Sequence, residues 1–139
     1  MVTFIITCDG GSLGNHDKSI VSKGYGSFLI TMPKHEKSIV HRMDYGDGVT
    51  SSEAEYMALV AALQHIVDSF NSVSANLKRI AVVVRTDSNN MVGQLSKNWK
   101  INKPNLRSLA IKASSLMQEF SQVTFDRISG VEMKEIIGH

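Results

Sequence analysis

Three acidic residues stand at positions where their carboxylates could act on one substrate or one cation. Asp9 follows an apolar run and precedes two glycines, Glu55 lies in the first turns of a segment with helical spacing, and Asp87 follows a run of β-branched residues. Carboxylates that lie close together in a low dielectric repel each other, so they hold protons at raised pKa or recruit cations. A set of oxygen ligands suits Mg²⁺ or Mn²⁺. These acids therefore predict a divalent-metal site if the fold brings them together.

Each acid also has a purely structural explanation. Asp9 could hydrogen-bond its own backbone in a turn, Glu55 could complement a helix dipole, and Asp87 could be the N-cap of the next helix. The structural explanation is favoured for each acid taken singly. The shared site is favoured for the three taken together, because an α/β sheet places ligands at the ends of its strands.

The elements that must position these acids follow from the hydrophobic pattern. Apolar and β-branched runs bounded by turn residues predict strands at residues 2–8, 24–32, 38–45, 79–86 and 122–129. Helical spacing predicts helices at residues 51–69, 88–96, 104–120 and 131–137, with Pro104 at a helix start and Gly138 at a helix end. Residues 14–23 are expected to form a loop, and residues 33–37 are expected to close a hairpin. Three opening strands followed by alternating helices and strands predict one α/β domain over residues 1–139, with helices packed on a mixed sheet.

Composition restricts the class of protein. The chain has 139 residues, of which 42% are hydrophobic, and a net charge of +2, which is too small to indicate nucleic-acid binding by itself. Cys8 is the single cysteine, which excludes an internal disulfide; we interpret it as a small buried strand residue. No run approaches the roughly 18 apolar residues of a membrane helix, and no signal-peptide pattern accompanies residues 1–7. We therefore expect a cytoplasmic monomer with no membrane partner.

Three segments resemble the motifs of the type 1 ribonucleases H. Residues 8–12 (CDGGS) resemble the motif of their first strand, residues 50–59 (TSSEAEYMAL) their helix motif, and residues 85–88 (RTDS) their third motif. In the helix motif the second acid is the catalytic one, which selects Glu55 and leaves Glu53 to helix capping and solvent. The three motifs stand in register over nearly the whole chain. The resemblance implies an RNase H-like fold with a five-stranded mixed β-sheet of order 3-2-1-4-5, flanked by helices.

The resemblance also implies an activity. It predicts an endoribonuclease that hydrolyses the RNA strand of RNA/DNA hybrids and leaves 5′-phosphate and 3′-hydroxyl ends. Asp9, Glu55 and Asp87 would be the catalytic residues and the ligands of two Mg²⁺ ions, about 3.5–4 Å apart, with Mn²⁺ as a substitute.

The residues implied to contact the hybrid lie beside these acids. They are Gly10, Gly11, Ser12, Ser51, Ser52 and Asn89. Glycine permits a close approach of the RNA backbone, and the last three would contact the minor groove and its 2′-hydroxyls. The family more often has asparagine at positions 51 and 52, and serine reaches less far.

The final segment departs from the family pattern, which has a fourth acid, an aspartate, on its last helix. No aspartate follows Asp126, and the candidates are Glu132, Glu135 and His139, among which the sequence does not choose. Residues beyond His139 could supply the acid, an atypical group could replace it, or three acids could suffice. The departure also motivates a second hypothesis, a catalytically impaired nucleic-acid-binding module. A third is a related nuclease that acts on another substrate.

A basic and aromatic segment lies between the predicted helices at residues 88–96 and 104–120. It contains Lys97, Trp99, Lys100, Lys103 and Arg107. Two interpretations are equally favoured: contact with the DNA strand and its phosphates, or a Trp side chain that anchors the helix, surrounded by solvated lysines. The remaining histidines, His16, His35, His41 and His65, have no metal-ligand spacing and are interpreted as surface or loop residues.

Overall fold

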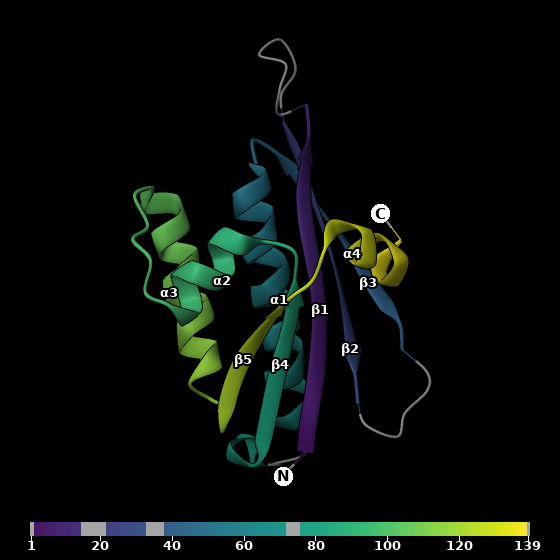
Figure 1. Ribbon diagram of the computed structural model, residues 1–139, viewed down its shortest axis with the longest axis vertical. Helices are drawn as coiled ribbons and strands as arrows, with labels where there is room; N and C mark the ends of the chain where they lie inside the picture. The colour runs from purple at the N-terminus through teal and green to yellow at the C-terminus, as the bar shows by residue number, and fades with distance from the viewer. Residues whose placement is uncertain (1, 15–21, 33–37, 72–75, 139) are drawn as a thin grey trace.

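The computed structural model describes residues 2–14, 22–32, 38–71 and 76–138, and a five-stranded sheet forms its centre (Figure 1). The strands are β1 (Val2–Leu13), β2 (Lys23–Thr31), β3 (Val40–Asp47), β4 (Ile80–Thr86) and β5 (Gln122–Arg127). Their order is β3-β2-β1-β4-β5. The first three strands are antiparallel, whereas β4 is parallel to β1 and β5 is parallel to β4. The predicted fold class and strand order are confirmed.

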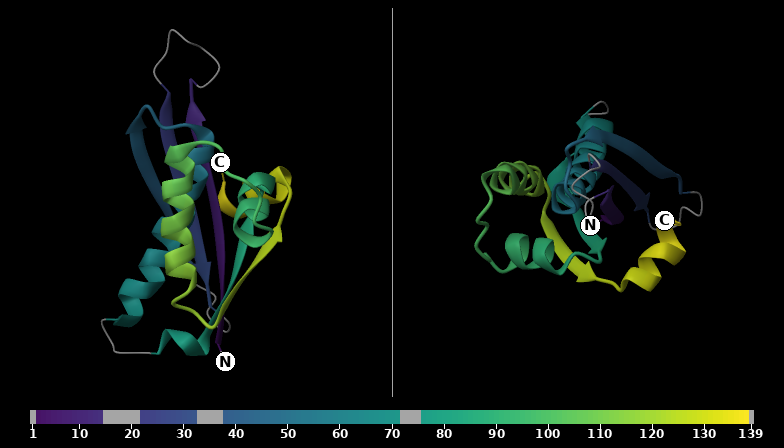
Figure 2. Two further views of the ribbon diagram at one scale, coloured as in Figure 1. Left: turned by 90° about the vertical axis from the view of Figure 1, so that its left-hand side faces the viewer. Right: turned by 90° about the horizontal axis from the view of Figure 1, so that it is seen from above.

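The helices cover both faces of this sheet. They are α1 (Ser51–Asn71), α2 (Asn89–Ser96), α3 (Pro104–Met117) and α4 (Gly130–Ile137), with a 3₁₀ turn, η1 (Leu77–Arg79), before β4. α1 packs on β1 and β2, and α3 packs along α1. α4 lies on the opposite face from α1, as the view from above shows (Figure 2). None of the helices in the described ranges is long and apolar enough to cross a membrane.

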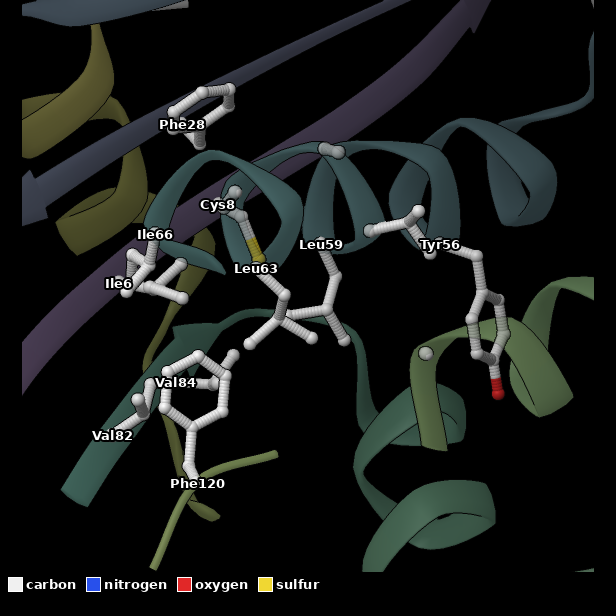
Figure 3. Packing of buried hydrophobic residues seen from close by; sticks show 14 of the residues in the cluster. Ile6, Cys8, Phe28, Tyr56, Leu59, Leu63, Ile66, Val82, Val84 and Phe120 are labelled. Atoms are coloured by element: carbon white, nitrogen blue, oxygen red, sulfur yellow. The ribbon is translucent and has the colours of Figure 1, made fainter. Parts of the chain in front are cut away.

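The two faces of the sheet have separate hydrophobic cores. The larger core joins the sheet to α1 and includes Ile6, Cys8, Leu59, Leu63 and Val84 (Figure 3). Cys8 is buried, as expected. A small cluster under α4 consists of Ile128, Met133 and Ile137, against which Leu29, Val40 and Ile136 pack. α4 is therefore attached independently of the main core.

The first strand is longer than expected, and Asp9 lies inside it. The prediction that the strand ends at residue 8 is wrong, because β1 stays paired with β2 as far as Leu13 opposite Lys23. Its pairing with β4 stops earlier, at Thr7 opposite Arg85. β1 thus extends past the end of β4 and leaves a free edge at the point where Asp9 lies.

Other element boundaries move for local reasons. The predicted helix at 104–120 ends at Met117, because the chain turns through short-range bonds (Phe120 N–H to the Met117 carbonyl, 3.2 Å) and buries Phe120. The last strand ends at Arg127 rather than at residue 129, because Ile128 enters the small cluster and Ser129 caps α4. The third strand begins two residues later than expected and continues to Asp47.

Several expectations concern residues whose structure is not described. The predicted turn at 33–37, most of the loop at 14–23, and His16, His35 and His139 lie outside the described residues. His65 is an exposed residue of α1, as expected. The interpretation of His41 as a surface or loop residue is wrong: it is a half-buried residue of β3, and its ring stacks on Phe28 at 4.6 Å between centroids.

Candidate active site

The three predicted acids meet where β1 continues beyond β4. Asp9 is in β1, Asp87 directly follows β4, and Glu55 is in the N-terminal part of α1. The side chain of Asp9 is hydrogen-bonded to that of Asp87, and the charges of Asp87 and Asp9 both act on Glu55. β4 ends at Thr86, and its last pair with β1 is Arg85 opposite Thr7. Asp9 therefore lies where β1 has no described strand neighbour on the β4 side.

Burial and mutual repulsion favour protonated carboxyl groups here. Burial, reinforced by the charge of Asp87 and the hydrogen bond to it, raises the pKa of Asp9 to about 6, although a bond from the Gly10 N–H opposes the shift. Burial raises the pKa of Glu55 to about 7; a hydrogen bond from Ser88 opposes this, and the charges of Asp87 and Asp9 add to it. Burial and the same three acids raise the pKa of the Cys8 thiol. The site therefore concentrates negative charge that protons or cations must neutralise.

The structural explanations for the acids do not account for this arrangement. Ser88, not Asp87, is the N-cap of α2, since its side chain accepts a hydrogen bond from the Met91 N–H at 3.2 Å. Asp9 is within a paired strand, so the turn explanation is wrong, although its carboxyl group does accept the Gly10 N–H.

Glu53, not Glu55, caps α1. The Thr50 N–H donates to Glu53 Oε1 at 3.1 Å, and the Glu53 N–H donates to Thr50 Oγ1 at 3.2 Å, which is a reciprocal capping box. Burial raises the pKa of Glu53, but bonds from Thr50 and Asn105 and the charge of Lys103 outweigh it, so the net shift is downward. Glu53 therefore does more than cap its own helix: it also connects α1 to the start of α3.

Close packing inside the protein explains both glycines of the first motif. A Cβ on Gly10 would lie 2.4 Å from the Ala54 carbonyl carbon, so glycine allows β1 to approach α1 next to Glu55. A Cβ on Gly11 would lie 2.4 Å from the hydroxyl oxygen of Tyr25. Tyr25 is directly opposite Gly11 in the β1–β2 ladder, so its side chain is on the same face as Asp9. Sequence reasoning missed Tyr25, because only the strand register reveals its place.

The predicted substrate-binding serines and asparagine have unequal access. Ser52 and Asn89 are exposed first-turn residues of α1 and α2, and Ser51 is half-buried. The hydroxyl oxygen of Ser12 is buried and has no hydrogen-bond partner within the described chain. Ser52 and Asn89 are thus the predicted contacts that a duplex can reach directly.

The first turn of α4 lies at Asp87. A Cβ on Gly130 would be 3.8 Å from Asp87 Oδ2, and Ser129 caps the helix by accepting the Glu132 N–H at 3.1 Å. At a rise of about 1.5 Å per residue, Glu132 is about 3 Å along the helix axis from Gly130, and Glu135 is about 7.5 Å along it. Both glutamates are exposed. Along the helix axis, Glu132 is therefore nearer than Glu135 to Gly130, the residue next to Asp87.

The donor set fits divalent cations in its chemistry. It consists of carboxylate oxygens with raised pKa values, which hard cations favour. In the described ranges, no three His, Cys, Asp or Glu side chains already have the arrangement of a metal site. Below about pH 6, where Asp9 is protonated, a cation would have to displace its proton before these oxygens could coordinate it.

The structure supports the anchoring interpretation of the basic segment between α2 and α3, and contact with the DNA strand stays a prediction. The Trp99 ring packs on Gly93 of α2, where a Cβ would lie 2.0 Å from a ring carbon. The backbone N–H of Trp99 donates to the Gly93 carbonyl at 3.1 Å. The side chain is nevertheless 43% exposed, and Lys97 Nζ is 5.8 Å from the ring centroid. Trp99 therefore anchors the segment while its side chain stays partly exposed, and Lys100 and Lys103 are exposed as well.

Comparison with known families agrees with the fold and the motifs. The family described as Reverse transcriptase-like matches residues 19–129, a range that includes Glu55 and Asp87 but not Asp9. The chain belongs to this family, and its motif order and sheet order are those of the type 1 ribonucleases H, which are hydrolases.

Individual relatives are moderately similar. The bifunctional protein Rv2228c of Mycobacterium tuberculosis is 29% identical over 122 residues, which are 88% of this chain and 30% of that protein. The chain thus spans 30% of the length of the curated relatives that it matches.

Solved structures of similar fold cover nearly the whole chain. LC11-RNase H1, isolated from compost, has a TM-score of 0.77 at 26% identity and covers 97% of this chain and 90% of its own. The same enzyme in complex with an RNA/DNA hybrid has a TM-score of 0.77 at 25% identity, and the match covers 95% of this chain and 89% of that one. The RNase H domain of Rv2228c has a TM-score of 0.77 at 24% identity, and the match covers 97% of this chain and 88% of that one.

Proposed function

We propose that this chain is an endoribonuclease that hydrolyses the RNA strand of RNA/DNA hybrids. The observation that carries the proposal is the convergence of Asp9, Glu55 and Asp87 at the free edge of β1, with raised pKa values for the first two. Family membership and a structural neighbour solved with a hybrid support the choice of substrate.

The proposed chemistry depends on charge at this edge. Asp9, Glu55 and Asp87 would hold two divalent cations, Mg²⁺ or Mn²⁺, which when bound activate water and stabilise the charge that develops on the phosphate and on the leaving 3′ oxygen. The Ser88 hydroxyl fixes Glu55 through its hydrogen bond and also caps α2. The expected products carry 5′-phosphate and 3′-hydroxyl ends.

The proposed duplex contacts surround the acids on several elements. Ser52 and Asn89 are exposed at helix N-termini and would contact the minor groove and its 2′-hydroxyls. The exposed part of Trp99 with Lys100 and Lys103 would contact the DNA strand. Gly10, Gly11, Ser12 and Ser51 complete the predicted set; of these, Gly11 and the hydroxyl oxygen of Ser12 are buried.

A second function is favoured by one observation. The described part of α4 carries no aspartate, and no described side chains form a ready metal site, which suits a hybrid-binding module with impaired catalysis. Binding without cleavage would distinguish this module from the nuclease.

The test uses end-labelled 20-base-pair duplexes of RNA/DNA, DNA/DNA and RNA/RNA, each incubated with and without Mg²⁺. Cleavage of the RNA strand of the hybrid alone, dependent on the cation, is the expected result. Fluorescence anisotropy in EDTA measures binding of the same duplexes. Hybrid binding without cleavage at any Mg²⁺ or Mn²⁺ concentration would establish the binding module, and cleavage of DNA/DNA would indicate another nuclease.

We also propose that the protein is a cytoplasmic monomer. Its single cysteine is buried and free, which suits a reducing compartment. Light scattering after size exclusion and fractionation of cells that produce the protein test these two proposals.

A further inference from the structure

The C-terminal end of α4 is hydrogen-bonded to a side chain of β3, the edge strand at the other end of the sheet from β5. Arg42 of β3 donates from Nη2 to the Ile137 carbonyl at 2.7 Å, and its Nη1 is 3.4 Å from Ser27 Oγ. The last carbonyls of a helix lack partners within the helix, and a cation there also interacts favourably with the helix dipole. Arg42 therefore supplies both a hydrogen bond and a charge to this end of α4.

A row of side chains across the sheet connects this contact to the acids. Asp9 is directly opposite Ser27 in the β1–β2 ladder, and Ser27 is directly opposite Arg42 in the β2–β3 ladder. Residues directly opposite each other point to the same face of a sheet. α4 crosses this face, with Gly130 at Asp87 and Ile137 at Arg42 (Figure 1). One end of the helix therefore lies next to Asp87, and the other end is bonded to Arg42.

Among the described residues, the other support of α4 on the sheet is mainly apolar. It has eight residues, too few for a stable isolated helix. Its apolar support is the small cluster around Ile128, Met133 and Ile137, which is separate from the main core. Burial of Met133 and Ile137 keeps one face of the helix on the sheet, and a charged hydrogen bond, which is more directional than apolar packing, adds a fixed partner for one particular carbonyl.

We propose that Arg42 is a positioning residue that fixes α4 with its first turn, and hence Glu132, at the candidate active site. Arg42 acts through α4 and touches neither the acids nor the duplex. The catalytic part of this inference rests on the proposed function, whereas the anchoring part does not.

The test compares Arg42→Gln, Arg42→Lys and the control Arg79→Gln, which changes an exposed arginine of η1. Hydrogen exchange is followed at the Met133 and Gly138 amides, which donate within the α4 turns, and at α1 amides as a reference. In Arg42→Gln we expect exchange in α4 at least tenfold faster with α1 unchanged, kcat reduced about tenfold, and KM for the hybrid within twofold. Arg42→Lys should be intermediate, and Arg79→Gln should match the parent.

The outcomes separate the two parts of the inference. Unchanged exchange in α4 would overturn the anchor, and faster exchange with unchanged kcat would overturn its role in the reaction. If the parent protein fails to cut the hybrid, the proposed function and the catalytic part fail together, while exchange still decides the anchor. If Arg42→Gln does not fold, Arg42→Lys decides: lysine cannot make both contacts, so exchange and kcat identical to the parent would overturn the proposal.

Discussion

The carboxyl groups of Asp9 and Asp87 are hydrogen-bonded to each other, although one is inside β1 and the other follows β4. Two carboxyl groups can share a hydrogen bond only when one of them carries a proton. Below about pH 6, where Asp9 is protonated, the pair shares a proton that a divalent cation would replace; burial and the charge of Asp87 raise the pKa of Asp9.

Replacing Asp87 with Asn should abolish cleavage and leave binding intact. The amide keeps the shape of the side chain but removes an anionic oxygen ligand, whereas affinity comes largely from phosphate contacts. We expect kcat to fall by about 10³-fold or more, an estimate based on the loss of charge stabilisation at the transition state, and the Kd in EDTA to stay within twofold. Full activity at saturating Mg²⁺ would refute the role of Asp87.

Asp9→Asn should stabilise the cation-free protein at high pH. The folded pKa of Asp9, about 6, lies above the ordinary value of 3.8, so its protonated form stabilises the fold. This contribution is fully present below about pH 4 and is lost as the pH rises through 6. The amide resembles the protonated acid at every pH, so the Asp9→Asn variant does not lose this contribution. At pH 8 its free energy of unfolding should exceed that of the parent by about 1–2 kcal/mol, after allowance for solvent screening.

Urea unfolding in EDTA at pH 5 and pH 8 measures this effect. Asp47→Asn, a change of an exposed aspartate in β3, is the matched control. A gain that is the same at both pH values, or is shared by the control, would show that the charge of Asp9 is not its source.

Glu55→Gln and Glu53→Gln should separate chemistry from positioning. Glu55→Gln removes a proposed ligand, so kcat should be lost. Glu53→Gln should retain kcat but lower stability by about 1 kcal/mol through the weakened cap. It should also raise KM a few-fold, because Glu53 of α1 joins Thr50, which precedes the helix, to Asn105 of α3. The opposite pattern, with only Glu53→Gln inactive, would mean that the motif is assigned two residues out of register.

Neutralising Lys100 should weaken hybrid binding without affecting the chemistry. Each phosphate contact that is lost lowers the dependence of log Kd on log salt concentration by about one. We expect Lys100→Gln to show a higher KM, a smaller slope and an unchanged kcat. Lys112→Gln, an exposed lysine on α3, is the control. A reduced kcat with the parental slope would contradict the assignment.

Among the candidates for the fourth position, Glu132 should matter most. Its place in the first turn of α4, near Asp87, predicts that Glu132→Gln raises the Mg²⁺ and Mn²⁺ concentrations for half-maximal rate. Glu135→Gln is the internal comparison, and His139→Ala tests the remaining candidate. If all three variants match the parent in both titrations, a site of three acids is the better account.

The sequence alone determined the elements and the three acids. The spacing of apolar residues predicts strands and helices locally, because it reflects which face of each element is buried. The motifs around Asp9, Glu55 and Asp87 then selected the acids among all carboxylates of the chain. The sheet order followed from the resemblance, and the structure agrees with it.

Only the tertiary structure decided how these pieces meet. The register that places Tyr25 over Gly11 and aligns Asp9, Ser27 and Arg42 depends on pairing between strands. A shift of one residue would turn each of these side chains to the other face, and local composition does not specify that choice. The approach of Gly130 to Asp87 and the bond from Arg42 to the end of α4 likewise join residues far apart in the chain. Such contacts have no period in the sequence, so their energetic consequences become visible only in the folded chain.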